Sequence, residues 1–237
     1  MQPSQSAALE ERKVVSLSNG GQLELELKYS RNPDSRKLAV CLHPWSWLGG
    51  RMDDPVLHSL VVVLEKHEYH ILRYNSRGVG ASKGWPSLTG HTEGKDLEAL
   101  VQWALQTIPE LRSIVLLGYS HGSLIASLHP LLPPPVKISH ILLSYPLGAR
   151  MFLTLFNSGS YASKLKELVE NPASNLLIIY GDQDEFTGAS RYDEWTKSLS
   201  SETSTLKVVK VEGGSHFWKG RANNTLQKEI DHWLAMF

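Results

Sequence analysis

The chain has 237 residues, with 24 lysines and arginines against 24 aspartates and glutamates. This length favours one domain with a sizeable core, and the balanced charge, without a basic block or acidic tail, argues against a nucleic-acid or anionic-membrane partner. Cys41 is the only cysteine, which excludes an internal disulfide. Because the sequence contains neither a transmembrane-length apolar run nor the apolar core of a signal peptide, we expect a cytoplasmic protein that acts on a small molecule.

Strands and helices are predicted to alternate along most of the chain, which begins with a flexible segment over residues 1–11. An alternating pattern first predicts an exposed edge strand at 23–29. Further strands are predicted at 37–42, 70–74, 114–117, 138–144, 175–180 and 206–211, and helices at 54–67, 92–106, after 120, at 191–200 and at 225–236. This alternation is typical of a parallel sheet covered by helices on both faces, in a single α/β domain over residues 12–237.

One segment, residues 146–173, is too long for a plain connection between two strands. It contains an apolar run at 151–156 and a charged helical pattern at 161–170. Ligands bind outside the carboxyl ends of the strands in such sheets, and an insertion after a strand lies over that opening. We interpret the segment as a small lid; an ordinary crossover helix with a longer lead-in is the alternative.

The sequence Gly118-Tyr119-Ser120-His121-Gly122 connects an apolar strand to a helical pattern. This is the context of a nucleophile elbow, in which a serine occupies a strained turn between strand and helix. A side chain at position 118 or 122 would collide with the neighbouring elements, so glycine is required there. Ser120 is the candidate nucleophile.

A serine hydroxyl needs a base to activate it, and the base needs an acid to orient it. Both follow Ser120 in the chain. His216, in a loop behind two glycines and directly after the last strand, is the candidate base. Asp182 and Asp184 both follow the preceding strand, and either of them can bind the histidine while the other caps the turn.

Two backbone N–H groups are expected to hold the oxyanion. One belongs to His121, and the other to Trp45, with Ser46 as the alternative because Pro44 has no N–H. Aromatic residues near these positions predict rigid apolar walls for the substrate, although core packing is the alternative for the tryptophans. The predicted wall residues are Trp45, Trp47, Phe152, Phe156, Phe217 and Trp218.

Taken in order, the segments HPWSWLGG, RYNSRGVGAS, GYSHG, GDQDE and GGSHFWKGR resemble the compact, nearly lidless branch of the α/β-hydrolase superfamily. The branch carries HPxxxxGG, NxRGxGxS, GxSxG and a terminal HFF-like histidine. The resemblance implies an eight-stranded, mostly parallel sheet. It also implies a triad of Ser120, Asp184 and His216, because the family's acid ends a strand-G-x-x-D motif. Glu185-Phe186-Thr187 stands where many relatives have Val-Pro, which leaves the substrate class open.

The expected function is that of a serine hydrolase that cleaves a small to medium ester or thioester through an acyl-enzyme on Ser120. The alternatives are an acyltransferase, C–C hydrolase, peptidase or cyclase of the same fold, and a non-catalytic binding protein. None of these activities requires a metal or a cofactor here, and the sequence does not indicate an oligomeric state.

Overall fold

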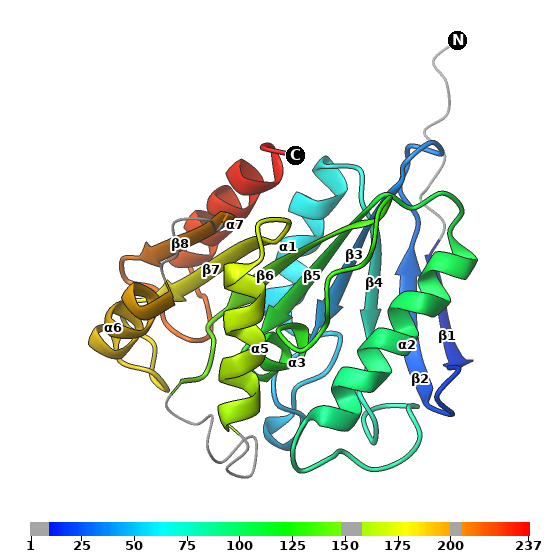
Figure 1. The fold of residues 1–237 in the computed structure, drawn as a ribbon, viewed down its shortest axis with the longest axis horizontal. Helices are drawn as coiled ribbons and strands as arrows, with labels where there is room; N and C mark the ends of the chain where they lie inside the picture. The colour runs from blue at the N-terminus through cyan, green and yellow to red at the C-terminus, as the bar shows by residue number, and fades with distance from the viewer. Residues whose placement is uncertain (1–9, 148–157, 200–204) are drawn as a thin grey trace.

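The computed structural model describes residues 10–147, 158–199 and 205–237 (Figure 1). The strands are β1 (Glu10–Ser16), β2 (Gln22–Lys28), β3 (Lys37–Leu42), β4 (His70–Tyr74), β5 (Ser113–Tyr119), β6 (Lys137–Leu143), β7 (Asn175–Gly181) and β8 (Thr205–Val211). The helices are η1 (Ser46–Leu48), α1 (Pro55–Lys66), α2 (His91–Thr107), α3 (His121–Ala126), α5 (Ser158–Glu170), α6 (Ala189–Leu199) and α7 (Arg221–Leu234).

The strands form one eight-stranded sheet in the order β1-β2-β4-β3-β5-β6-β7-β8. Strand β2 runs antiparallel to both β1 and β4, and the remaining neighbours are parallel. The arrowheads of β3, β4 and β5 therefore point to the same edge of the sheet (Figure 1). The predicted α/β class and the mostly parallel sheet are confirmed.

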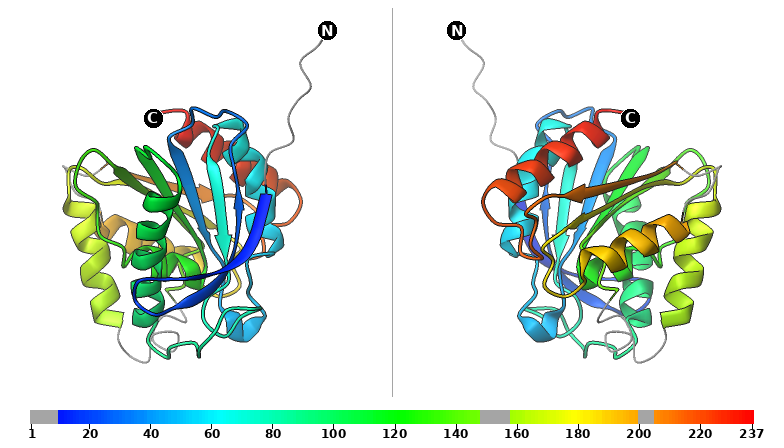
Figure 2. Two further views of the ribbon diagram at one scale, coloured as in Figure 1. Left: turned by 90° about the vertical axis from the view of Figure 1, so that its right-hand side faces the viewer. Right: turned by 90° about the vertical axis from the view of Figure 1, so that its left-hand side faces the viewer.

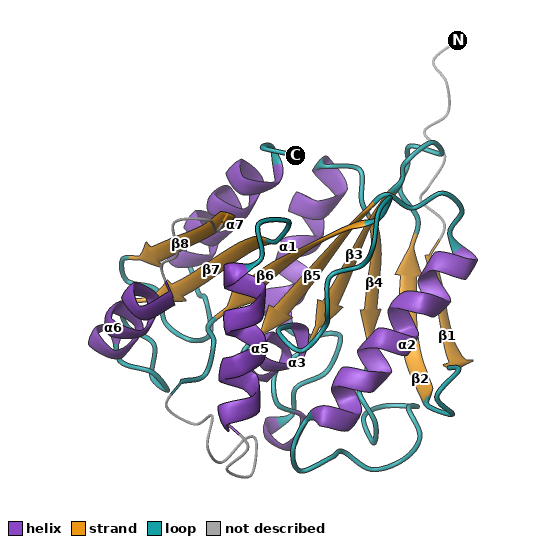
Figure 3. Cartoon of the chain, viewed as in Figure 1, coloured by secondary structure: helices purple, strands orange, loops and turns teal. Residues whose placement is uncertain are grey.

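Helices cover both faces of the sheet. One face packs against α2, α3, α5 and α6, and the other packs against α1 and α7 (Figures 2 and 3). Within β5, Ile114 and Leu116 face the first layer, whereas Val115 and Leu117 face the second. This burial on both sides explains why the central strands are continuous apolar runs without alternation.

The N-terminal edge of the sheet differs from the prediction. Strand β1 begins at Glu10, so residues 10 and 11 belong to the sheet and not to a flexible segment. Only Val15 of its side chains is buried, and the strand therefore lacks a clear apolar alternation. Because β1 covers β2, the strand predicted at the edge is internal, and Leu23, Leu25 and Leu27 are fully buried.

The lid predicted over residues 146–173 is not found in the described part of that segment. Helix α5 packs on the sheet with Tyr161 and Leu165 buried in the core, and the Tyr161 hydroxyl donates to the Thr89 carbonyl at 2.7 Å. These contacts are those of a crossover helix between β6 and β7. Residues 148–157, which include Phe152 and Phe156, lie outside the described residues.

Candidate active site

Ser120 lies in a tight turn between the end of β5 and the first residue of α3. Its backbone has φ 53° and ψ −119°, a conformation that L-residues rarely adopt. A Cβ atom at Gly122 would lie 2.3 Å from the Leu42 carbonyl oxygen, and one at Gly118 would lie 2.4 Å from that of Gly122. The two glycines therefore allow β5, α3 and β3 to meet around the serine, as expected of a nucleophile elbow.

The three predicted triad side chains form one chain of hydrogen bonds. The Ser120 hydroxyl lies 3.0 Å from His216 Nε2, and His216 Nδ1 lies 2.8 Å from Asp184 Oδ2. All three residues are buried. The structure thus brings together, from the ends of β5, β7 and β8, groups that are far apart in the sequence. A serine whose proton can pass to an oriented imidazole is the arrangement required of an acyl-transfer nucleophile.

Asp184, and not Asp182, reaches the histidine. Asp184 Oδ1 accepts hydrogen bonds from the backbone N–H groups of Phe186 at 2.8 Å and Thr187 at 3.0 Å, and Oδ2 faces His216. Asp182 Oδ1 instead accepts from the Gly213 N–H at 2.7 Å. Asp182 therefore ties the loop after β7 to the loop after β8, whereas Asp184 orients the imidazole.

The loop that carries His216 is fixed by contacts that the sequence reasoning missed. The Tyr119 hydroxyl donates to the His216 carbonyl at 2.9 Å, and the His216 N–H donates to Glu185 Oε2 at 2.8 Å. The Phe186 ring lies edge-on to the imidazole, with centroids 4.6 Å apart. The positions of these three residues, directly before the nucleophile and directly after the acid, are the signal that would have found them.

The loop after β3 carries the second expected oxyanion donor, Trp45. His43 fixes this loop: its ring lies 2.6 Å from the Pro44 carbonyl through Nδ1, and its Nε2 accepts from the Ser76 N–H at 3.0 Å. Burial lowers the pKa of His43 to about 4, so the ring is neutral at neutral pH. The Trp45 N–H has no hydrogen-bond partner among the described residues. His121 is the first residue of α3, where the N–H has no intrahelical acceptor.

A cavity of about 440 Å³ opens at Ser120 and His216. It lies at the carboxyl ends of the parallel strands, where ligands bind in sheets of this type. Its walls are mostly apolar and aromatic. The described residues that line it are Pro44, Trp45, Leu48, Gly49, Gly50, Asp54, Tyr119, Ser120, Pro146, Phe186, His216 and Phe217.

The predicted aromatic walls are only partly found. Trp45 and Phe217 line the cavity, but Trp47 is 65% exposed and is absent from its described lining. Trp218 is 3% exposed and packs in the core under α1 and α7, where its Nε1–H donates to Ser144 Oγ at 2.9 Å. Neither tryptophan therefore lines the described cavity as predicted, and Leu48 and Phe186 are in the lining.

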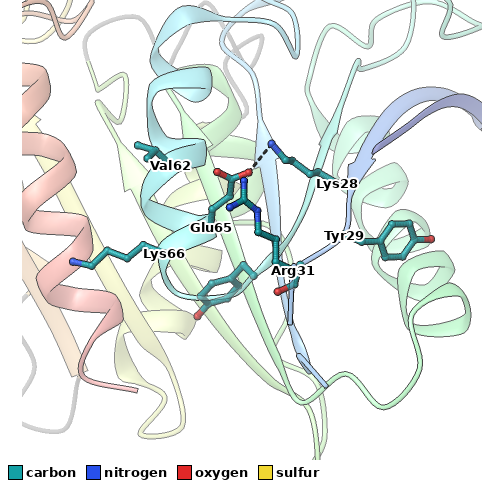
Figure 4. A pocket seen from close by; sticks show the side chains of 8 residues that line it. Lys28, Tyr29, Arg31, Val62, Glu65 and Lys66 are labelled. Carbon is teal, nitrogen blue, oxygen red and sulfur yellow. Dashed lines mark ion pairs between the residues drawn. The ribbon is translucent and has the colours of Figure 1, made fainter. Parts of the chain in front are cut away.

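A second cavity, of about 290 Å³ (Figure 4), shares no lining residue with the first. It is bordered by Val62, Glu65 and Lys66 near the end of α1, and Glu65 pairs with Lys28 at 2.5 Å (Figure 4). The active-site cavity is lined by Asp54, the residue that caps the start of the same helix. A helix of 12 residues spans about 18 Å, so the two cavities are separate.

Comparisons with known proteins agree with the α/β fold of the chain. A family model described as "alpha/beta hydrolase fold" matches residues 48–146. The chain is similar to the structure of an alpha-beta serine hydrolase homologue from Coxiella burnetii, with 25% identity, a TM-score of 0.72, and coverage of 95% of this chain and 96% of that one. A serine hydrolase "without lid" from Xanthomonas campestris has 23% identity and a TM-score of 0.72 over 100% of this chain and 96% of the other.

Among curated proteins, an uncharacterized protein of Rickettsia prowazekii is 27% identical over 91% of this chain and 86% of its own length. The protein therefore has the α/β-hydrolase fold, and the family match and the related structures support a hydrolase. No helix within the described residues has both the length and the apolar character needed to cross a bilayer.

Proposed function

We propose that the protein is a serine hydrolase that cleaves small to medium carboxylic esters or thioesters through an acyl-enzyme on Ser120. The observation that carries this proposal is the hydrogen-bonded chain from Asp184 through His216 to Ser120, which ends in a largely apolar cavity. A binding protein of the same fold has no need for an oriented base on a strained serine, because strained backbone at a site is a cost to stability.

In the proposed reaction, Ser120 Oγ attacks the carbonyl carbon while His216 Nε2 takes the hydroxyl proton. Asp184 holds the Nδ1–H and stabilises the imidazolium. The resulting oxyanion accepts hydrogen bonds from the N–H groups of Trp45 and His121. When the intermediate collapses, the imidazolium gives its proton to the leaving alcohol or thiol. Water then attacks the acyl-enzyme, with His216 again as base, and releases the acid and the free serine.

The cavity supports a substrate of limited size. Each buried methylene contributes about 0.8 kcal/mol until the space is full, and the lining rings of Trp45, Phe186 and Phe217 are rigid walls. We therefore propose acyl groups between about C2 and C8 as the best substrates, because hydrophobic pockets discriminate by about tenfold over a few methylenes. Long-chain lipids are expected to be poor substrates.

The test is the hydrolysis of p-nitrophenyl esters from C2 to C16 by the wild type and by Ser120→Ala, with folding checked by circular dichroism. The variant is expected to lose about 10³-fold or more in kcat. Retention of a tenth of wild-type turnover by Ser120→Ala would disprove the proposed nucleophile. A continuous rise in kcat/KM to C16 with interfacial activation would instead disprove the proposed substrate size.

A further inference from the structure

One charged residue lines the active-site cavity without a part in the proposed chemistry. Asp54 is the only carboxylate residue among the described residues of its lining, since Asp184 lies behind His216. Asp54 also caps helix α1: its Oδ1 accepts from the Val56 N–H at 2.8 Å. Asparagine caps helices about as well as aspartate, so the capping role does not by itself account for a negative charge at this position.

Asp54 interacts electrostatically with His216 and with Tyr119. Burial raises the pKa of this carboxyl, while the N–H groups of Val56 and Leu57 and the attraction of His216 oppose the rise. The same carboxylate contributes to the raised pKa of Tyr119, whose hydroxyl holds the backbone of His216. Asp54 therefore lines the cavity near His216, the residue that would deliver a proton to the leaving group.

Other charges near the entrance are more exposed. Glu185 is exposed and absent from the described lining, and its Oε2 accepts from the His216 backbone N–H. Lys219 lies 5.9 Å from the centroid of the Phe217 ring, and both Lys219 and Arg51 are exposed and absent from the described lining. Water and salt screen such exposed charges more than a half-buried carboxylate. Among the residues of the described lining, Asp54 alone carries a carboxylate, so a negative charge lies at the cavity wall.

The remaining walls suit a cation. Four aromatic residues, Trp45, Tyr119, Phe186 and Phe217, are among those that line the cavity, and the faces of aromatic rings attract ammonium groups. A carboxylate among aromatic rings favours a cationic nitrogen and repels a second carboxylate or a phosphate. A neutral ligand of the same shape gains the apolar contacts but no attraction to Asp54.

We propose that the cavity selects esters whose alcohol part carries a cationic nitrogen, and that Asp54 is the residue that provides this selectivity. This inference rests on the proposed serine-hydrolase function. The proposed function defines the substrate by the size of its acyl group, and this inference also specifies the charge of its alcohol group.

The test uses two esters of the same shape, 2-(trimethylammonio)ethyl acetate and 3,3-dimethylbutyl acetate, which differ by a cationic nitrogen in place of a carbon. The wild type should prefer the cationic ester by about tenfold in kcat/KM, the ratio expected for unit charges about 6 Å apart at an effective dielectric constant of about 40. In Asp54→Asn, which keeps a helix-capping side chain, the ratio should fall several-fold, to the part that the aromatic residues alone supply.

Asp53→Asn is the matched control, because it removes the same charge one residue away. The Asp53 carboxylate lies 3.5 Å from Arg12 and 3.9 Å from Arg73, outside the described cavity lining. This variant should keep the wild-type ratio. A wild-type ratio of one or less, or an unchanged ratio in Asp54→Asn, would overturn the inference. An equal fall in both variants would show a general charge effect and would also overturn it.

The outcome is separable from that of the proposed function. Hydrolysis of the neutral ester that is lost in Ser120→Ala would uphold the hydrolase even if the charge preference is absent. If neither ester is a substrate, the two parent alcohols, 2-(trimethylammonio)ethanol and 3,3-dimethylbutanol, are compared as protectants against labelling of Ser120 by a fluorophosphonate. Stronger protection by the cationic alcohol in the wild type, reduced in Asp54→Asn, is then the expected result, and equal protection would overturn the inference.

Discussion

The two oxygen atoms of the Asp184 carboxylate have different hydrogen-bond partners. Its Oδ1 atom accepts the N–H groups of Phe186 and Thr187, which hold the turn after β7, and its Oδ2 atom binds His216 Nδ1. The Tyr192 hydroxyl also donates to Oδ2, at 3.4 Å. The backbone thus holds Asp184 through Oδ1, while Oδ2 orients the His216 imidazole. In this orientation Nε2 can accept the Ser120 proton.

Asp184→Asn is expected to lower kcat by about 10²- to 10⁴-fold, because the amide favours the wrong imidazole tautomer. Asp182→Asn is the paired comparison. It weakens the bond to the Gly213 N–H and should cost about 1 kcal/mol of stability, with a small effect on turnover. Steady-state kinetics and urea unfolding of both variants check this. The opposite order in kcat would assign the orienting role to Asp182.

The predicted site residues that the structure brings together are those whose neighbours constrain them tightly. Ser120 is identified by two glycines that cannot carry a side chain, and His216 by its place after the last strand. The choice between Asp182 and Asp184 came only from the family resemblance, because both follow the same strand and residue spacing does not specify where a turn aims each side chain. The prediction that Trp218 lines the substrate cavity did not hold for the same reason, because its side chain packs in the core.

The elbow depends on close contact between three elements, β3, β5 and α3. A Cβ at Gly122 would approach backbone atoms of Leu42 and His43, at 2.3 Å from the Leu42 carbonyl oxygen and 2.7 Å from that of His43. Strand β3 cannot move aside easily, because it is paired on both sides, with β4 and with β5. The position of Ser120 is therefore set by how closely α3 can approach the sheet.

Gly122→Ala is expected to destabilise the fold by about 1–3 kcal/mol or more, the usual cost of overpacking, and to reduce turnover because Ser120 shifts with α3. Gly159→Ala is the control. Gly159 lies in α5 with open space around its Cβ position, and the substitution should be neutral or stabilise by up to about 1 kcal/mol. Thermal unfolding and ester hydrolysis report both effects. Equal stability of the two variants would show that the elbow tolerates a side chain.

The sequence predicted the buried strands well but missed the edge strand β1. Strands β3 to β7 are recognisable because burial on two faces demands apolar runs. Strand β1 was missed because most of its side chains are exposed and its stability comes from pairing with β2. Helix α5 was interpreted as part of a lid because the segment 146–173 is too long for a plain connection, but Tyr161 and Leu165 place this helix in the core.

The molecule as a whole contains several buried histidines whose neutral form is part of the fold. His140 on β6 is fully buried, and neither of its ring nitrogens makes a hydrogen bond of normal geometry with the described residues. Burial lowers the pKa of His140 to about 3, and repulsion by His129 adds to the shift. Burial also lowers the pKa of His129 to about 4. Unfolding exposes these rings to water, where they bind protons at a pKa near 6.5.

The free energy of unfolding should therefore fall as the pH drops below about 6.5, because the unfolded chain binds more protons than the folded one. The stability due to neutral His140 is complete above the unfolded pKa and declines towards the folded value of about 3. Between pH 7.5 and pH 5 this single group accounts for a loss of about 2 kcal/mol. His140→Leu should reduce the pH dependence by that amount, as measured by urea unfolding across the range.

His232 provides the comparison, since it is exposed on α7. His232→Leu should leave the slope of unfolding free energy against pH close to that of the wild type. If His140→Leu and wild type lose stability in parallel between pH 7.5 and pH 5, protonation of His140 does not contribute to acid unfolding.

The central claim is that Ser120 is an activated nucleophile, and covalent labelling tests it most directly. Intact-mass analysis after treatment with a fluorophosphonate should show a single adduct on the wild type at neutral pH, located to Ser120 by peptide mapping, and none on folded Ser120→Ala. His216→Ala should be labelled far more slowly, because the hydroxyl then lacks its base. The absence of an adduct on the folded wild type, or an adduct that persists in Ser120→Ala, would contradict the account.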